Sequence, residues 1–183
     1  MKKIKLLLYC GKQPHKLFKP AKGFVLSDFE LGDFFKEKIL LNGKILAECD
    51  FKVEALERIS DNIRYAGVEG GEWLNEDYYE YKSCLGEGEL FNYVKDKFYA
   101  INIENLNIFD EPREIYECCV KPYNQMSPII NINGIKKVWY LGNNKNEYED
   151  YIAISVKPEE LCRILNKEQT IIIRNKVLKE MVK

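Results

Sequence analysis

Cationic and aromatic side chains at the ends of predicted strands are the first candidates for chemistry. Tyr9 and Lys12 close an apolar N-terminal run, Lys157 follows another apolar run, and Arg174 follows three isoleucines. A guanidinium at the end of an isoleucine run normally needs an anionic partner. Arg, Lys and an aromatic ring together are the groups that hold single-stranded RNA. The pattern predicts RNA-binding residues Tyr9, Lys12, Lys157, Arg174 and Lys176, with a buried Tyr9 and solvated lysines as the alternative interpretation.

Catalysis on RNA needs cations that stabilise the phosphorane and a group that moves protons. Tyr9, Lys12 and Ser127 are the candidate catalytic residues. The single histidine, His15, lies in a basic loop, and no nuclease motif is readable. Whether the chain is an enzyme therefore stays open; if it catalyses a reaction, we expect a ribonuclease.

Two acids, Glu48 and Asp50, share the polar face of a predicted strand. They could bind a metal ion, but solvated pairs of this kind are common on strands, and we favour that interpretation. Six cysteines without a CxxC pair, together with one histidine, argue against a zinc site. We expect no metal and no cofactor, and free cysteines in a reducing cytoplasm.

Three tyrosines, Tyr78, Tyr79 and Tyr81, lie in a glutamate-rich stretch. Tyr is favoured at protein interfaces, and the neighbouring acids repel phosphate. This stretch is therefore predicted to contact protein rather than nucleic acid. The predicted protein-contact residues are Glu76, Asp77, Tyr79 and Glu80.

Length and composition predict one soluble domain over residues 1–183, with an acidic loop insertion near 61–82. No stretch approaches the length of a membrane span, and we expect a cytoplasmic monomer. The net charge of −1 is unevenly distributed. Residues 1–22 hold seven lysines and no acid, and residues 157–183 have seven basic against four acidic residues, so −1 − 7 − 3 = −11 falls on residues 23–156. If the two ends meet, they form one basic face.

The elements that position these residues are mostly strands. We predict strands at 3–10, 44–53, 98–108 (broken near Asn105), 129–132, 137–141, 151–156 and 170–174. A helix is predicted from Pro158, with Leu161, Ile164 and Leu165 on one face, and a shorter one at 86–94 with Leu90 and Phe91 inward. Residues 27–41 are ambiguous, 112–116 are predicted as a helical turn, and 142–150 as a polar loop. Dominant strands with few short helices favour a closed mixed barrel.

Three segments resemble the ASCH family, a PUA-like β-barrel superfamily. Ser155, Val156, Lys157 and Pro158 match its S-I-K-P turn, and Thr170 and Arg174 match part of the following G-x-K-T-x-E-x-R strand. The run GKILAECDFKV resembles the family strand G-K-V-V-A-E-F, and YAINIENLNIFDEP a later strand. Because the turn motif comes last here, the chain is similar to permuted ASCH proteins of phages. The resemblance implies an α+β fold, a mixed, largely antiparallel PUA-like β-barrel with residues 1–10 beside 170–174.

The resemblance also bears on activity. Some ASCH relatives are amidohydrolases acting on acylated nucleosides, through the motif lysine and a polar residue at the motif glutamate. Those positions are Gln169 and Ile172 here, and neither activates a nucleophile. The resemblance therefore implies no deacylation.

Three functions follow as hypotheses. The first is an RNA-binding ASCH-like protein of a phage or mobile element, a counter-defence (anti-CRISPR) factor that binds guide RNA with its effector protein or promotes its cleavage. The second is a protein-interaction inhibitor whose acidic middle mimics nucleic acid. The third is a nucleotide-binding pocket.

Overall fold

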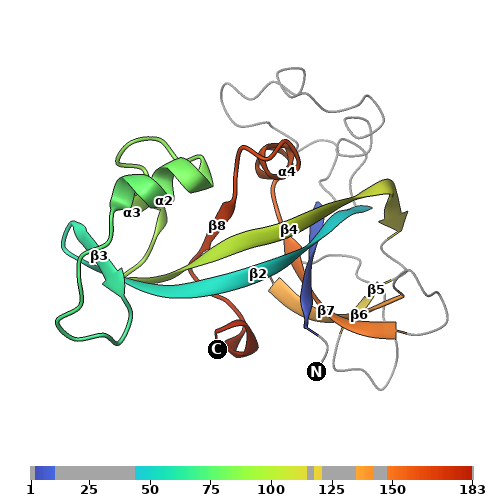
Figure 1. The fold of residues 1–183 in the computed structure, drawn as a ribbon, viewed down its shortest axis with the longest axis horizontal. Helices are drawn as coiled ribbons and strands as arrows, with labels where there is room; N and C mark the ends of the chain where they lie inside the picture. Colours follow the sequence, from blue (N-terminus) through green and yellow to red (C-terminus); the bar gives the residue numbers. More distant parts are fainter. Residues whose placement is uncertain (1–2, 11–43, 115–117, 121–134, 142–147, 183) are drawn as a thin grey trace. The chain divides into compact units, whose positions relative to one another are not determined.

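The computed structural model of the chain describes residues 3–10, 44–114, 118–120, 135–141 and 148–182. They form two compact units. The first unit comprises described residues of Met1–Asp50 and Asn105–Asn166, and the second comprises those of Phe51–Glu104 and Lys167–Lys183. Two long strands, β2 (Lys44–Ile59) and β4 (Lys97–Glu114), contribute to both units (Figure 1).

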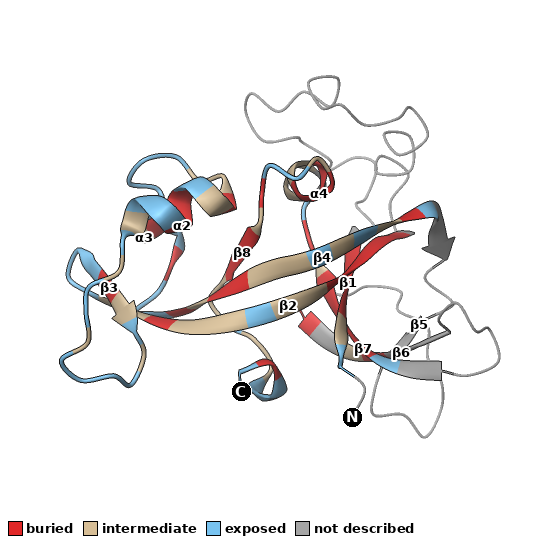
Figure 2. Ribbon diagram, viewed as in Figure 1, coloured by how far each residue is buried: buried red, intermediate tan, exposed pale blue. Residues whose placement is uncertain are grey.

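Strand β1 (Lys5–Cys10) is central to the sheet of the first unit. It pairs antiparallel with β2 and parallel with β7 (Tyr148–Ser155). Antiparallel pairing continues from β7 to β6 (Ile135–Leu141) and then to β5 (Cys118–Val120). Residues Leu6 to Tyr9 are completely buried, and because successive side chains of a strand point to opposite faces, both faces of β1 are covered (Figure 2).

Helix α4 (Pro158–Leu165) follows β7 and packs against β1. Proline stands at the start of the helix, where its missing N–H costs nothing. Leu161, Ile164 and Leu165 are buried, which confirms the predicted apolar face. The turn before the helix is held to β1, since the Val156 N–H donates to the Tyr9 carbonyl over 2.9 Å.

The second unit has a mixed core. β8 (Ile171–Arg174) pairs with the first part of β4, and β3 (Asn62–Tyr65) with the last part of β2. Helix α2 (Glu76–Ser83) packs against β8 and against α3 (Leu90–Tyr93), and a 3-10 turn, η3 (Lys179–Met181), lies near the C-terminus (Figure 1). The buried cluster of this unit comprises Leu56, Ile63, Tyr79, Leu90, Val94, Phe98, Ala100, Ile171 and Ile173.

Several predicted elements differ from the structure. β4 continues through Glu114, so the predicted helical turn at 112–116 is wrong for residues 112–114. The acidic stretch near 61–82 contains β3 and α2 rather than loop alone. The predicted short helix is α3, with Leu90 buried and Phe91 packed on the core, as expected. The predictions for 27–41 and 129–132 lie outside the described residues, and residues 148–150 of the predicted polar loop belong to β7.

The predicted class of fold is confirmed: a mixed α+β chain with a mostly antiparallel sheet and few short helices. The strand order is β5-β6-β7-β1-β2-β4-β8, with β3 on β2. The predicted pairing of residues 1–10 with 170–174 is wrong within the described residues, because β1 already has β2 and β7 as partners and β8 pairs with β4. The predicted single basic face loses that support.

The predicted break near Asn105 is a local irregularity within a continuous β4, not an end of the strand. Asn105 has φ of 49°, in the left-handed region. Its side chain contacts Asp50, whereas two residues further along β2 the contact is from Lys52 to Glu104. Asp50 and Lys52 lie on one face of β2, so the side chains of Glu104 and Asn105, which are neighbours in β4, both reach that face. Asn tolerates this backbone conformation better than most residues.

Substitution at Asn105 tests this backbone strain. Asn105→Gly and Asn105→Ala both lose the hydrogen bond to Asp50, but only alanine meets a Cβ penalty at positive φ. We expect Asn105→Gly to be more stable than Asn105→Ala by about 1 kcal/mol, the reverse of their order in an ordinary strand. Urea unfolding of both variants measures the difference, and an alanine variant as stable as the glycine variant would contradict the left-handed conformation.

Candidate functional site

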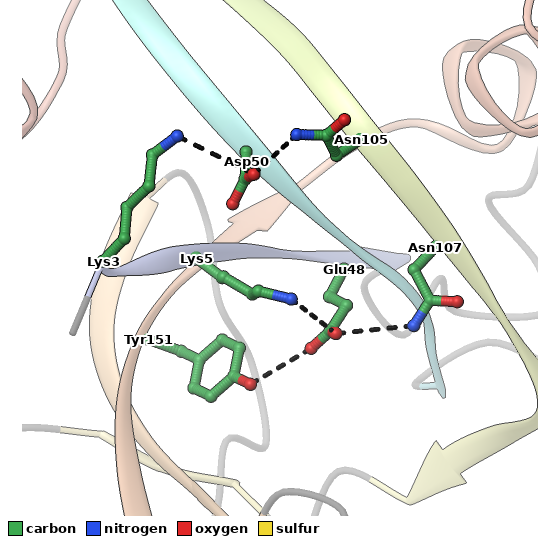
Figure 3. Close-up of polar contacts among 7 residues, drawn as sticks. All are labelled: Lys3, Lys5, Glu48, Asp50, Asn105, Asn107 and Tyr151. Atoms are coloured by element: carbon green, nitrogen blue, oxygen red, sulfur yellow. Dashed lines mark hydrogen bonds and ion pairs between the residues drawn. The ribbon is translucent and has the colours of Figure 1, made fainter.

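The polar face of β2 carries the two acids that the sequence suggested as a metal pair (Figure 3). Glu48 is buried, with 8% of its surface exposed. Its Oε1 accepts from Lys5 Nζ of β1 over 3.0 Å and from Asn107 Nδ2 of β4 over 3.4 Å. Its Oε2 accepts from the Tyr151 hydroxyl of β7 over 3.1 Å. One carboxylate thus joins four strands, and it is stable in the interior because donors surround it.

Strand register explains why these groups meet. Glu48 lies opposite Leu7, and Lys5 stands two residues before Leu7 on the same face of β1. In the parallel ladder Lys5 is itself the partner of Tyr151. Both donors therefore reach the carboxylate from neighbouring strands.

Asp50, two residues along β2, has an analogous but more exposed arrangement (Figure 3). Asn105 Nδ2 donates to its Oδ2 over 2.8 Å, and Lys3 Nζ lies 3.7 Å from the same oxygen. The Asn105 hydrogen bond, helped by the charges of Lys3 and Lys5, outweighs desolvation and lowers the pKa of Asp50 below its usual 3.8. Asp50 is therefore ionised at neutral pH.

This cluster is poorly suited to catalysis. The Glu48 hydrogen bond raises the pKa of Lys5 above 10.5, so its ammonium group stays charged and is neither nucleophile nor base. Burial, with Asp50 and Glu48 adding to it, raises the pKa of Cys49 to about 12, which keeps the thiol protonated. A metal ion would have to displace a lysine from each acid. We interpret the cluster as structural, and the solvated-pair interpretation of Glu48 is wrong because Glu48 is buried.

Tyr9 occupies the core of the first unit. The residue has 0% exposure and packs with Leu7, Ile45, Phe109 and Val138 among others. A base could stack on its ring only if this core opened. The expectation that Tyr9 presents its ring to RNA is corrected accordingly, because β1 is covered on both faces.

The predicted cations fall in different places. Lys157 is exposed in the first unit, immediately before α4. Arg174 ends β8 in the second unit, where it is half-buried and its Nη1 donates to the Ile173 carbonyl over 2.8 Å. Lys176 is exposed two residues further on. Lys12 and Ser127 lie outside the described residues.

The two positions that matter for deacylation are both buried. Gln169 is 3% exposed, and its Nε2 donates to the Ile171 carbonyl over 3.0 Å. Ile172 is completely buried in β8. Their side chains serve the fold of the second unit.

Two of the four predicted protein-contact residues are internal. Tyr79 is 3% exposed, and Glu80 is 4% exposed with its Oε1 accepting from the Leu90 N–H over 3.1 Å. Helical periodicity turns these residues toward the core, so the prediction of a contact surface is corrected for them. Glu76 is half-buried, and burial together with Glu80 raises its pKa. Asp77 is exposed.

The aromatic surface of the second unit is formed by other residues. Tyr78 is 47% and Tyr81 77% exposed on α2, and Trp73 is 55% exposed before it. Tyr65 of β3, at 44% exposure, was not foreseen, because only strand pairing brings it near α2.

Sequence reasoning also missed a basic group around Arg174. Tyr99 lies directly opposite Arg174 in the β4–β8 ladder, and Lys97 stands two residues before Tyr99. The Lys95 N–H donates to Asn175 Oδ1 over 2.8 Å. Two lysines preceding a predicted strand were the available signal, but their proximity to Arg174 depends on pairing between distant segments.

Comparison of the chain with protein-family models, curated proteins and solved structures finds no match. Within the described ranges, no helix combines the length and apolar character needed to span a membrane.

Lys5 of β1 and Lys3, which precedes β1, provide a matched test of the acid cluster. Lys5→Met leaves the buried Glu48 without its cation, whereas Lys3→Met removes a 3.7 Å contact whose lysine side chain is 59% exposed. We expect Lys5→Met to lower the free energy of unfolding by about 2 kcal/mol and Lys3→Met by less than about 1 kcal/mol. Chemical denaturation measures both, and equal losses would contradict the structural role of Glu48.

Proposed function

We propose that the chain is an RNA-binding protein of the ASCH type, with its RNA contacts at the end of the second unit where β8 finishes. The resemblance motivates RNA as the ligand class. The observation that carries the proposal is the register that sets Tyr99 opposite Arg174. We call Lys95, Lys97, Arg174 and Lys176 the basic end.

Three lysines of the basic end are available for phosphate. Lys95, Lys97 and Lys176 are exposed, and no ion pair to another described residue neutralises them. Asp96 lies between the first two, so the group of five charges, the four of the basic end and Asp96, has a net charge of 4 − 1 = +3. Lys5 and Lys52, by contrast, are paired with acids. Several uncompensated cations on one edge are the electrostatic feature that phosphate contacts require.

Aromatic rings accompany these cations. Tyr93 is 47% exposed, and its carbonyl accepts from Asn175 Nδ2 over 3.2 Å, next to Arg174 in sequence. Tyr99 is half-buried. An exposed ring beside cations is the arrangement on which unpaired bases stack.

We also propose, from the resemblance alone, a closed PUA-like barrel, a phage origin and guide RNA as the target. Deacylation is not proposed, because Gln169 and Ile172 are buried and neither side chain can act as a nucleophile or a base.

Salt-dependent RNA binding tests the basic end. A fluorescein-labelled single-stranded RNA of roughly 12 nucleotides is titrated with wild type and with Lys97→Ala, Lys176→Ala and Tyr93→Ala variants at several salt concentrations. Each lysine variant is expected to weaken binding of every sequence alike and to reduce the salt slope by about one. Tyr93→Ala should weaken binding by about 1–3 kcal/mol with an unchanged slope.

Lys52→Ala is the matched control. Lys52 is an exposed lysine of the same unit, with a side chain that is 72% exposed, but it is paired with Glu104 over 3.0 Å. Its removal should leave RNA affinity unchanged. The proposal fails if wild type binds no RNA, or if folded Lys97→Ala and Lys176→Ala bind as wild type does.

A further inference from the structure

Glu54 of β2 is a carboxylate surrounded by neutral donors. The Tyr79 hydroxyl donates to its Oε2 over 3.2 Å, and Asn102 Nδ2 donates to the same oxygen over 3.4 Å. The Tyr65 hydroxyl donates to Oε1 over 3.4 Å. All four residues belong to the second unit, and Glu54 is half-buried.

The other acids of β2 each have a cation. Glu48 is paired with Lys5, Asp50 with Lys3 and Glu57 with Arg64. Within the part of the chain that the structure describes, Glu54 has no Lys or Arg partner. A half-buried charge held by long, neutral hydrogen bonds is incompletely compensated, because charge-assisted bonds are shorter, at about 2.7–2.9 Å, and stronger.

The surroundings of Glu54 favour a planar cation. Tyr65 and Tyr78 are 44% and 47% exposed, and the Tyr78 ring packs edge-to-face on Tyr79 at 5.3 Å. β3 pairs with the last four residues of β2, and Tyr65 lies opposite Leu56, two residues after Glu54 (Figure 1). Guanidinium groups stack on tyrosine faces while donating to a carboxylate. The unit already contains such a contact, since the Arg58 guanidinium lies 4.4 Å from the centre of the Phe91 ring.

The charge of the adjoining segment matches a basic ligand. Residues 65–81 contain five acids and no Lys or Arg. Glu54 also raises the pKa of the Tyr65 hydroxyl, and desolvation followed by Glu54 raises that of Tyr79. Both hydroxyls therefore stay protonated and keep the carboxylate in place.

We propose that Glu54, with the rings of Tyr65 and Tyr78, binds an arginine side chain on an exposed segment of a partner protein. This site is separate from the basic end and does not depend on RNA binding. Arginine is favoured over lysine because its flat head can stack on a ring and donate two bonds at once.

A peptide titration tests this inference. The probe is the peptide acetyl-Gly-Ser-Arg-Ser-Gly-amide, and its binding is measured by NMR chemical-shift changes of this protein chain. The comparison peptides carry citrulline, which has nearly the same shape without charge, or lysine in place of arginine. We expect saturable shifts at Tyr65 and Tyr78 with the arginine peptide, and binding at least about tenfold weaker with citrulline.

Protein variants separate the site from general acidity. Glu54→Gln should weaken binding of the arginine peptide at least about tenfold, and Tyr78→Ala should weaken that binding while leaving the carboxylate in place. Glu57→Gln is the matched control, because Glu57 lies on the same strand but is already paired with Arg64; it should bind as wild type does. Absent binding, equal binding of citrulline or lysine, or an unaffected Tyr78→Ala variant would each overturn the proposal. Free arginine binding more tightly than the peptide would overturn the assignment to a partner protein.

Discussion

The requirement that charge be compensated inside a sheet governs much of this structure. Glu48 is an acid in the interior of the first unit, and its position is tolerable because β1, β4 and β7 each deliver a donor to it. Loss of the β4 or β7 contact would remove a neutral donor, and loss of the β1 contact would remove Lys5, the cation paired with this carboxylate. The contacts of Glu48 also disfavour catalysis at this cluster, since they keep Lys5 charged and occupy both carboxylate oxygens.

The acids of β2 differ in whether a cation neutralises them. This difference separates the acids that stabilise the fold from the acid that could bind a ligand. Glu48 and Asp50 are satisfied within the first unit, while Glu54 in the second unit has neutral donors. The cations follow a parallel pattern. Lys5 and Lys52 are paired with acids, whereas Lys97 and Lys176 are exposed without such a partner among the described residues. The proposed RNA contacts of Lys95, Lys97 and Lys176 and the proposed arginine site at Glu54 both rest on charges that have no ion-pair partner among the described residues.

Local patterns were sufficient to predict some of this architecture. Leu161, Ile164 and Leu165 defined the buried face of α4 because helical periodicity does not depend on distant segments. The backbone irregularity at Asn105 lies where a break was predicted, although β4 continues through it. The run of residues 6–9 has no polar alternation, which is typical of a strand buried on both faces, and the prediction of Tyr9 as a surface ring was wrong.

The sites depended on contacts between distant segments. The environment of Glu48 requires four strands, and that of Glu54 requires β2, β3, β4 and α2. Tyr79 and Glu80 were assigned to the surface because their stretch is acidic, but tertiary packing turned them inward. The sequence did not indicate a role for Lys97, because its proximity to Arg174 depends on the pairing of β4 with β8. Charge composition thus indicated which segments are polar, but not which charges are already matched.

The most direct test of charge compensation compares Glu48→Gln with Glu54→Gln by urea unfolding at neutral pH. Both changes keep the shape of the side chain and remove one negative charge. Glu48→Gln leaves Lys5 without its anion and is expected to lower the free energy of unfolding by about 2 kcal/mol. Glu54→Gln removes a charge that has no cation, and the free energy of unfolding should stay within about 0.5 kcal/mol of wild type or rise. If Glu54→Gln costs as much as Glu48→Gln, Glu54 is compensated within the fold and the distinction between the two acids is wrong.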